Sequence, residues 1–331
     1  MMHPMRRSAV LLVVALALAT GPRARAQPAD MADLRARAEA GDAAAQVELA
    51  ERLRLGQGVA PDPPAAADWF RRAAAQNDTY AQLALGTLYE HGEGVARDGA
   101  AAMDWYRAAA EQGEVLAQLA LATMLREGRG VPVDDVEAAR WFQAVADQGY
   151  AVGQINLAFM YLDGIGVPRD QARALVLLGR AAAKGHPVAQ NNLGLLYAEG
   201  QGGMPRDAAR AVGWHRKAAE QGLANAQYHL ARAYETSAGV DPDEVAAREW
   251  YALAAVQGEP LARTALAAMY REGRGGPADP VTALAWLILA AGGPEAPPDA
   301  ATKRDALAAQ LGEADNVAAA RKAEQLVAGS G

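Results

Sequence analysis

A 36-residue period runs through most of the chain and limits the folds that it can adopt. The dipeptide Ala-Gln marks the register at Ala45, Ala81, Ala117, Ala189 and Ala226, and Gly153 and Ala262 hold the same place. Every step is 36 residues except the one from Ala189 to Ala226, which is 37 because the loop near Gly203 is longer. Seven copies of one short unit are typical of an array in which each repeat buries its apolar face against its neighbours.

A glycine-rich stretch, YEHGEGVARD at residues 89–98, raises the alternative of a phosphate-binding loop. Close copies lie at 53–62, 125–134, 161–170 and 270–279, and looser ones at 197–207 and 234–243. A single nucleotide site needs one such loop, preceded by a strand and containing a Lys-Ser or Lys-Thr pair, and neither feature is visible. We therefore interpret the stretch as a turn.

Each repeat predicts two helices. Small or apolar residues from Ala81 to Tyr89 recur at the three-and-four spacing of an amphipathic helix, and Gly92 and Gly94 then end it. A second helix follows from about Gly99 to Gln112 and ends at Gly113. A leucine column and two alanine columns are the same in all seven repeats, which indicates a shared packing geometry.

An invariant aspartate precedes each second helix. Its carboxylate can accept the unpaired amide hydrogens of the first turn and faces the positive end of the helix dipole, so we interpret these acids as helix caps and not as catalysts or metal ligands. The predicted caps are Asp62, Asp98, Asp134, Asp170, Asp207, Asp243 and Asp279.

All six tryptophans fall in one column of the second helix, and Leu177 replaces tryptophan in the fourth repeat. A recurring aromatic column is typical of core packing, because a binding aromatic needs no structural copies. The tryptophans are Trp69, Trp105, Trp141, Trp214, Trp250 and Trp286.

These patterns predict an all-α fold, an α-solenoid of about seven helix-turn-helix repeats over residues 45–293. The ends of such a stack need capping elements with a polar outer face. We expect a linker and a capping helix within residues 27–44, and C-terminal capping helices within residues 294–331, at about 300–311 and 313–327.

Residues 1–26 have the layout of a cleaved secretory signal peptide, with Arg6 and Arg7, a short apolar run from Ala9 to Ala19, and cleavage predicted after Ala26. The run is too short to span a bilayer, so we expect no stable membrane insertion after cleavage and a periplasmic or secreted protein. The absence of cysteine excludes a lipoprotein-type anchor and disulfide bonds.

The net charge and the residue types present argue against several classes of function. The formal net charge is -7, and removal of the four arginines of residues 1–26 leaves -11, which argues against nucleic acid as a partner. The only serines are Ser8, Ser237 and Ser330, and none lies in a serine-nucleophile motif. No His-x-x-x-His pair is present. We therefore predict no enzymatic activity, no cofactor and no metal site.

The first helix with LGTLYEHGEGV, followed by Asp98, Ala102, Trp105 and the segment AAAEQG at 108–113, closely resembles the Sel-one-like repeat family. This family is a branch of the tetratricopeptide-type helical solenoids. The resemblance implies a right-handed superhelix of antiparallel helix pairs whose concave surface binds protein partners. It also implies a role in envelope or exopolysaccharide signalling, or in host-cell interaction for secreted members.

Some proteins similar to this family have been called β-lactamases, which leaves a hydrolase as a remote alternative. The Ser-x-x-Lys signature and the cysteine pairs of that subgroup are missing here. The repeat pattern itself departs from the family at Leu177, at Ser237 in place of a loop glycine, and at Met204 and Gly276 in place of valine.

The predicted binding groove lies on the first helices, at the positions two and six residues after the Ala-Gln anchor, where the residue type varies between repeats. In the middle repeats these positions would form an apolar patch with polar edges, suited to an extended peptide of a protein in the cell envelope. The alternatives are that Phe159 only fills a gap between helices, or that the groove binds a peptidoglycan or other glycan. The candidate partner-binding residues are Ile155, Phe159, Asn191, Leu195, Tyr228 and Arg232.

Overall fold

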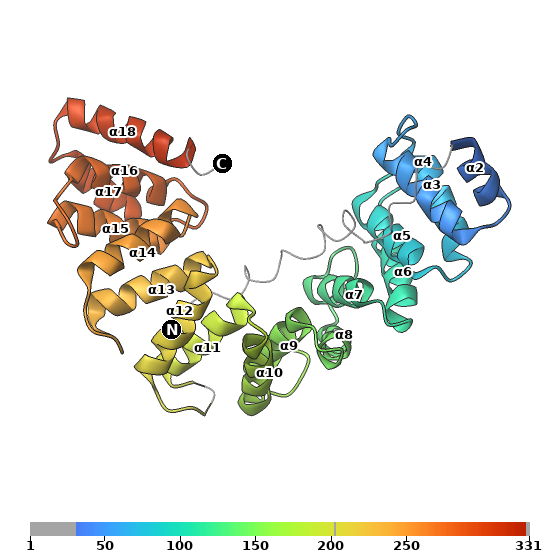
Figure 1. The fold of residues 1–331 in the computed structure, drawn as a ribbon, viewed down its shortest axis with the longest axis horizontal. Coiled ribbons are helices and arrows are strands. Elements are labelled where there is room, and N and C mark those ends of the chain that lie inside the picture. Colours follow the sequence, from blue (N-terminus) through green and yellow to red (C-terminus); the bar gives the residue numbers. More distant parts are fainter. Residues whose placement is uncertain (1–30, 202, 329–331) are drawn as a thin grey trace. The chain divides into compact units, whose positions relative to one another are not determined.

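The computed structural model describes residues 31–201 and 203–328, and every regular element within these ranges is an α-helix (Figure 1). The predicted signal peptide lies outside the described residues. The contacts between residues divide the chain into two compact units, one up to Leu177 and one from Leu178. The division falls within α10 (Gln171–Ala183). We call them the N-terminal and the C-terminal unit.

Both units are built from pairs of short helices, of which the first in each repeat is called here the A helix and the second the B helix. The N-terminal unit contains α2 (Met31–Glu39), the A helices α3 (Ala43–Leu55), α5 (Thr79–His91), α7 (Val115–Glu127) and α9 (Ala151–Asp163), and the B helices α4 (Pro63–Ala74), α6 (Gly99–Glu111) and α8 (Asp135–Asp147). The C-terminal unit contains the A helices α11 (Pro187–Glu199), α13 (Ala224–Thr236) and α15 (Pro260–Glu272), and the B helices α12 (Ala208–Glu220), α14 (Glu244–Val256) and α16 (Pro280–Ala291), followed by α17 (Ala300–Ala308) and α18 (Glu313–Ala328).

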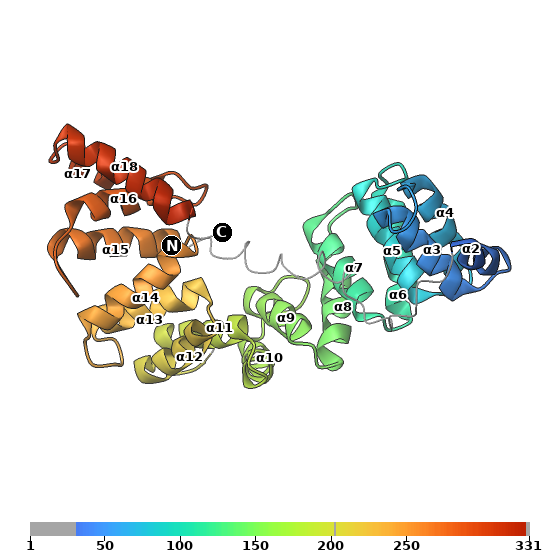
Figure 2. The same ribbon diagram turned by 45° about the horizontal axis from the view of Figure 1, so that its top comes forward.

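Consecutive helices lie side by side within each unit, from α2 to α9 and from α11 to α16, in both views (Figures 1 and 2). At the end of the chain α17 and α18 both pack on α16. The leucine column is buried in every repeat, with side chains no more than 5% exposed. The prediction of an all-α solenoid is therefore confirmed.

The seven aspartates predicted as caps each precede a B helix, and each side chain accepts a hydrogen bond from a backbone N–H of the first turn. The distance is 2.8 Å from Glu137 N to Asp134 Oδ1. Four A helices have acidic caps as well, which sequence analysis did not single out: Asp42, Asp78, Glu114 and Glu259.

Replacing Asp134 by alanine should lower the free energy of unfolding by about 1 kcal/mol, because one amide hydrogen of α8 loses its acceptor. Asp134→Asn should be nearly neutral, since asparagine caps a helix about as well. Urea denaturation followed by far-UV circular dichroism measures both changes. An equal loss in the two variants would assign the effect to the lost charge and not to the cap.

The first loop glycine ends the A helix in the left-handed conformation, as at Gly92 with φ of 76° and Gly164 with φ of 70°. Ser237 takes this place in the sixth repeat and adopts the same conformation, with φ of 56°. The interpretation of the stretch as a turn is confirmed.

The second loop glycine has a further role that the sequence did not reveal. A Cβ atom added at Gly166 would lie closer than 3.0 Å to the carbonyl oxygen of Asp135, at the start of the preceding B helix. The same holds for Gly94 against Pro63, whereas Gly58, which has no preceding B helix, has nothing within 4 Å. Glycine is therefore required here because the loop backbone touches the neighbouring repeat.

The glutamine of the Ala-Gln pair, used above only as a marker, connects its A helix to the B helix of the preceding repeat and to the end of the B helix in its own repeat. Gln82 is 3% exposed, its Nε2 donates to the carbonyl oxygen of Ala74, and its Oε1 accepts from Gln112 Nε2 at 2.8 Å. Four further pairs repeat the contact: Gln46 with Gln76, Gln118 with Gln148, Gln190 with Gln221, and Gln227 with Gln257. Gln154 Oε1 is buried without a hydrogen-bond partner among the described residues.

The tryptophan column occupies the edge of the core. Trp69, Trp105 and Trp250 pack against buried clusters but are only half-buried, and Trp286 is the one that is 4% exposed. The next residue along each B helix, which follows tryptophan in six repeats and Leu177 in the fourth, is buried throughout, and none of these residues is more than 6% exposed: Phe70, Tyr106, Phe142, Leu178, His215, Tyr251 and Leu287.

Candidate functional site

The structure separates the six predicted groove residues by burial. Ile155 and Phe159 lie on α9 of the N-terminal unit, and the other four lie on α11 and α13 of the C-terminal unit. Phe159, Leu195 and Tyr228 are half-buried and Arg232 is exposed. Ile155 is only 4% exposed and Asn191 only 6% exposed.

The expectation that Ile155 and Asn191 lie at the surface is therefore corrected. The position two residues after the anchor is buried in three more repeats, as at Val47, which is 1% exposed and belongs to a core cluster with Ala81 and Ala84 of the next A helix. An A helix such as α5 packs against α4 on one side and α6 on the other, so the surface that it leaves free is narrower than the sequence pattern indicates.

Within each unit, the free surface of the A helices is a narrow strip formed by two columns of side chains. Tyr80 donates from its hydroxyl to Glu51 Oε1 at 2.7 Å, so the position six residues after one anchor touches the position one residue before the next anchor. We call these two columns the A-helix strip. Its half-buried or exposed members are Ala44, Glu51, Tyr80, Thr87, Leu116, Thr123, Val152 and Phe159 in the N-terminal unit, and Val188, Leu195, Asn225, Arg232, Leu261 and Ala268 in the C-terminal unit.

Beneath the strip of the C-terminal unit lies a chain of polar side chains. His215 Nδ1 lies 2.9 Å from Asn191 Oδ1, and Asn191 Nδ2 donates to Asn225 Oδ1 at 3.1 Å. The rings of His215 and His229 stack with their centroids 4.9 Å apart, and Tyr228 packs edge-on against His229. His229 Nε2 is buried without a hydrogen-bond partner among the described residues. Asn191 is thus a buried support and not a contact surface.

Burial lowers the pKa of both histidines. The pKa of His215 falls to about 4 because its ring is removed from water. Burial also lowers the pKa of His229, and the nearby His215 and Arg232 act in the same direction. Both rings are therefore neutral at pH 7, and the C-terminal unit contains two groups that resist protonation while folded.

Stability of the C-terminal unit should fall as the pH drops below about 6.5, the pKa of histidine in an unfolded chain. From there toward pH 4 the unfolded chain binds protons that the folded one does not, which costs about 1.4 kcal/mol per pH unit for each histidine. Above pH 6.5 the two residues contribute no pH dependence.

Urea denaturation at pH 7.5 and pH 5 tests this expectation with His215→Phe as the comparison, since Phe70 and Phe142 fill the same place in other repeats. The variant should lose less stability between the two pH values than the wild type does. Equal losses would show that these histidines do not control the acid sensitivity.

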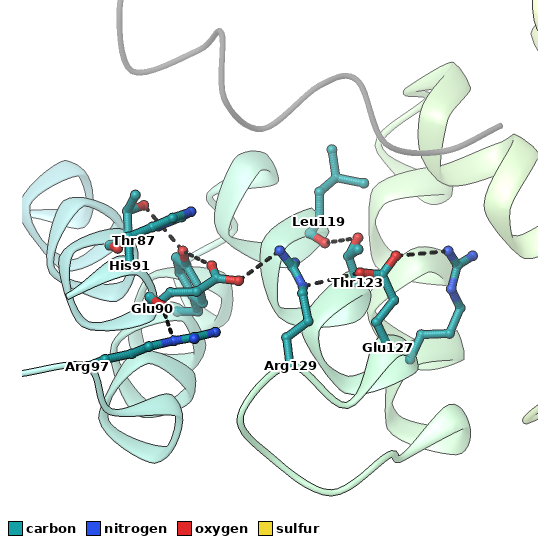
Figure 3. A network of polar contacts seen from close by, with 10 residues as sticks. Thr87, Glu90, His91, Arg97, Leu119, Thr123, Glu127 and Arg129 are labelled. Carbon is teal, nitrogen blue, oxygen red and sulfur yellow. Dashed lines mark hydrogen bonds and ion pairs between the residues drawn. The ribbon is translucent and has the colours of Figure 1, made fainter. Parts of the chain in front are cut away.

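A buried acidic side chain links α5 to the loop after α7 in the N-terminal unit, as Figure 3 shows. Glu90, whose side chain is 8% exposed, accepts a hydrogen bond from the Tyr106 hydroxyl at 2.8 Å and pairs with Arg129 at 2.7 Å. Burial and the carboxylate of Glu90 raise the pKa of Tyr106. Arg129 also pairs with Glu127 at 3.3 Å.

The same bridge recurs in the C-terminal unit. The Tyr251 hydroxyl donates to Glu235 Oε2 at 2.7 Å, and Arg274 pairs with Glu235 at 2.6 Å. Sequence analysis missed both bridges, although a signal was present: in the column of Tyr106, tyrosine stands only where the preceding A helix has glutamate at the position of Glu90. We assign these bridges to the pairing of neighbouring repeats.

Two features are absent from the part of the chain that the structure describes. Among residues 31–201 and 203–328, no three His, Cys, Asp or Glu side chains lie close enough together to hold a metal ion. No helix in these ranges is long and apolar enough to cross a membrane.

Comparison with known proteins identifies the repeats. The Sel1 repeat model matches seven consecutive segments: residues 43–78, 79–114, 115–150, 151–186, 187–223, 224–259 and 260–292. No curated protein matches the chain at a significant level.

Among solved structures, the chain is similar to a Sel1 repeat protein from Oxalobacter formigenes, with 34% identity and a TM-score of 0.75 over 83% of this chain and 78% of that one. It is also similar in sequence to c5321, a protective antigen of uropathogenic Escherichia coli with 28% identity over 89% of this chain and 78% of that one, at a TM-score of 0.44. The seven matched segments agree with the helix pairs described above. The chain therefore belongs to the Sel1 repeat family.

Proposed function

We propose that the protein is a non-catalytic, exported scaffold that binds a protein or peptide of the cell envelope on its A-helix strip. Sel1 repeat proteins are generally protein-interaction scaffolds, and this chain has seven such repeats. Its place in envelope or exopolysaccharide signalling is part of the proposal and rests on the family resemblance and the predicted signal peptide.

One observation carries the proposal. The four columns that hold the repeats together do not vary, whereas the strip position six residues after the anchor holds a different side chain in almost every repeat: Glu51, Thr87, Thr123, Phe159, Leu195, Arg232 and Ala268. Variation confined to a half-exposed strip gives each repeat its own chemistry toward a ligand, which is what specific recognition of an extended partner requires.

Phe159 and Arg232 are the most distinctive strip residues of the two units. Phe159 is the only phenylalanine outside the column of buried B-helix residues, and it remains half-buried. Arg232 is the exposed cation of α13. An aromatic and an arginine are the residue types that most often dominate binding energy at protein interfaces.

The test is capture of a partner from envelope extract by the mature protein, by Phe159→Ala and Arg232→Ala, and by two exposed B-helix controls, Arg140→Ala and Glu249→Ala. One protein recovered by the wild type and both controls, but lost with at least one of the two strip variants, is the expected result. Binding to insoluble peptidoglycan that survives in both strip variants, or hydrolysis of nitrocefin by the pure protein, would contradict the proposal.

A further inference from the structure

Arg232 is an exposed cation on the strip without an ionic partner. Within the described part of the chain it forms no ion pair, and it lies one turn after Tyr228 on α13. The other arginines of the A helices in this unit are occupied. Arg263 donates to the carbonyl oxygens of Ala255 and Leu289, and Arg271 pairs with Glu272 at 2.7 Å.

The acidic side chains around Arg232 are engaged elsewhere. Glu235, three residues later, is held by the Tyr251 hydroxyl and by Arg274. Glu259 caps α15 through the backbone N–H of Leu261. The guanidinium of Arg232 is therefore available to an anionic group from outside the chain.

Apolar side chains lie on both sides of Arg232 along the strip. The register set by Tyr80 and Glu51 places Leu261, which is 37% exposed, next to Arg232 at the start of the following A helix. On the other side, Leu195 fills the same column in the preceding A helix and is half-buried. A peptide bound at Arg232 can therefore contact apolar side chains on both sides of it. This arrangement favours an internal segment of a polypeptide over a chain terminus.

The charge of the C-terminal unit permits an acidic ligand. Residues 178–331 contain 15 Lys and Arg against 17 Asp and Glu, whereas residues 27–177 contain 13 against 22. The negative charge of the mature chain is therefore concentrated in the N-terminal unit, and an acidic segment meets little net repulsion at the C-terminal one.

We propose that the C-terminal unit binds an extended segment of its partner through an aspartate or glutamate side chain seated on Arg232, with apolar partner side chains against Leu195 and Leu261. The inference deepens the proposed function and rests on it. Packed helices lie about 8–10 Å apart and an extended chain advances about 3.3 Å per residue, so the apolar residues should stand about three positions before and after the acid.

Selection of random linear peptides displayed on phage tests this motif with the mature protein as bait. The wild type should enrich peptides with a central Asp or Glu and an apolar residue about three positions away on each side. Arg232→Glu should lose the acidic preference and enrich Lys or Arg at the same position. Arg321→Glu on the exposed face of α18 is the matched control and should select as the wild type does.

Fluorescence anisotropy with an enriched peptide then measures the contact. Replacing its Glu by Gln should weaken binding to the wild type about tenfold, because a hydrogen-bonded charge pair is lost, and should change little with Arg232→Gln. Enriched peptides without an Asp or Glu at a fixed distance from the apolar residues would overturn the inference. An unchanged preference of Arg232→Glu for acidic peptides would overturn it as well. Partner capture that depends on Phe159 but not on Arg232 would overturn it while leaving the proposed function intact.

Discussion

Replacement of Gly166 by alanine should destabilise the N-terminal unit by about 3 kcal/mol. Two costs combine at this residue. Its φ of 67° lies in the left-handed region, where a side chain costs about 1–2 kcal/mol. The added Cβ would also press on the backbone carbonyl of Asp135, and such overpacking typically costs a further 1–3 kcal/mol.

Gly58 is the matched control, because it occupies the same loop position with φ of 75° but has nothing within 4 Å of an added Cβ. Gly58→Ala should cost only about 1–2 kcal/mol. Urea denaturation of the two variants, followed by far-UV circular dichroism, measures the difference. If both lose the same free energy of unfolding, the second loop glycine serves backbone conformation alone and the contact between repeats is not limiting.

Arg129→Ala should lower the free energy of unfolding by about 2–3 kcal/mol. The substitution leaves the buried carboxylate of Glu90 without its cation, and breaking a buried ion pair costs about 3–5 kcal/mol. We expect less than that range because the Arg129 side chain is 33% exposed and the Tyr106 hydroxyl remains bound to the carboxylate.

A pair of comparisons separates burial from charge in the same denaturation experiment. Arg107→Ala breaks a pair with Glu137 in which the side chains are 30% and 27% exposed, and it should cost about 1 kcal/mol or less. Adding Glu90→Gln to Arg129→Ala should recover part of the loss, since the buried charge is removed. A double variant less stable than Arg129→Ala alone would contradict this account of the bridge.

The sequence alone predicted the architecture because its cues act within one repeat. Spacing of apolar residues, glycines at helix ends and an aspartate before each B helix all report local backbone geometry, and the observed bounds of α5 and α6 lie within two residues of the prediction. The α2, α17 and α18 helices flank the repeats, and their capping role stays a prediction.

Features that depend on contact between repeats were harder to predict. The role of Gly166 depends on a carbonyl 31 residues earlier in the chain, and that of Gln82 depends in part on the carbonyl of Ala74 in the preceding repeat. The error at Ile155 has the same origin, because helical periodicity gives the direction of the buried face but not its width. The tryptophans drew attention to their column, whereas in every repeat but the last the more deeply buried residue is the next one along the helix.

The A-helix strip was therefore predicted only in part. Phe159, Leu195 and Arg232 belong to it, and Tyr228 lies beside it. Their contact with a partner stays a prediction. Asn225 and Leu261 belong to the strip because the residue before one anchor contacts the residue six positions after the previous anchor. Tyr80 and Glu51 show this contact in the structure. The sequence pattern gives no indication of it.

Photo-crosslinking tests the central claim, recognition of a partner by the A-helix strip, most directly. Benzoylphenylalanine would be introduced at Phe159 or Tyr228, and for comparison at the exposed B-helix residues Arg140 or Glu249, followed by irradiation of the protein in intact cells. We predict that the first two positions crosslink to the same protein and that the B-helix positions do not. Crosslinks to a partner from the B-helix positions alone would contradict the claim.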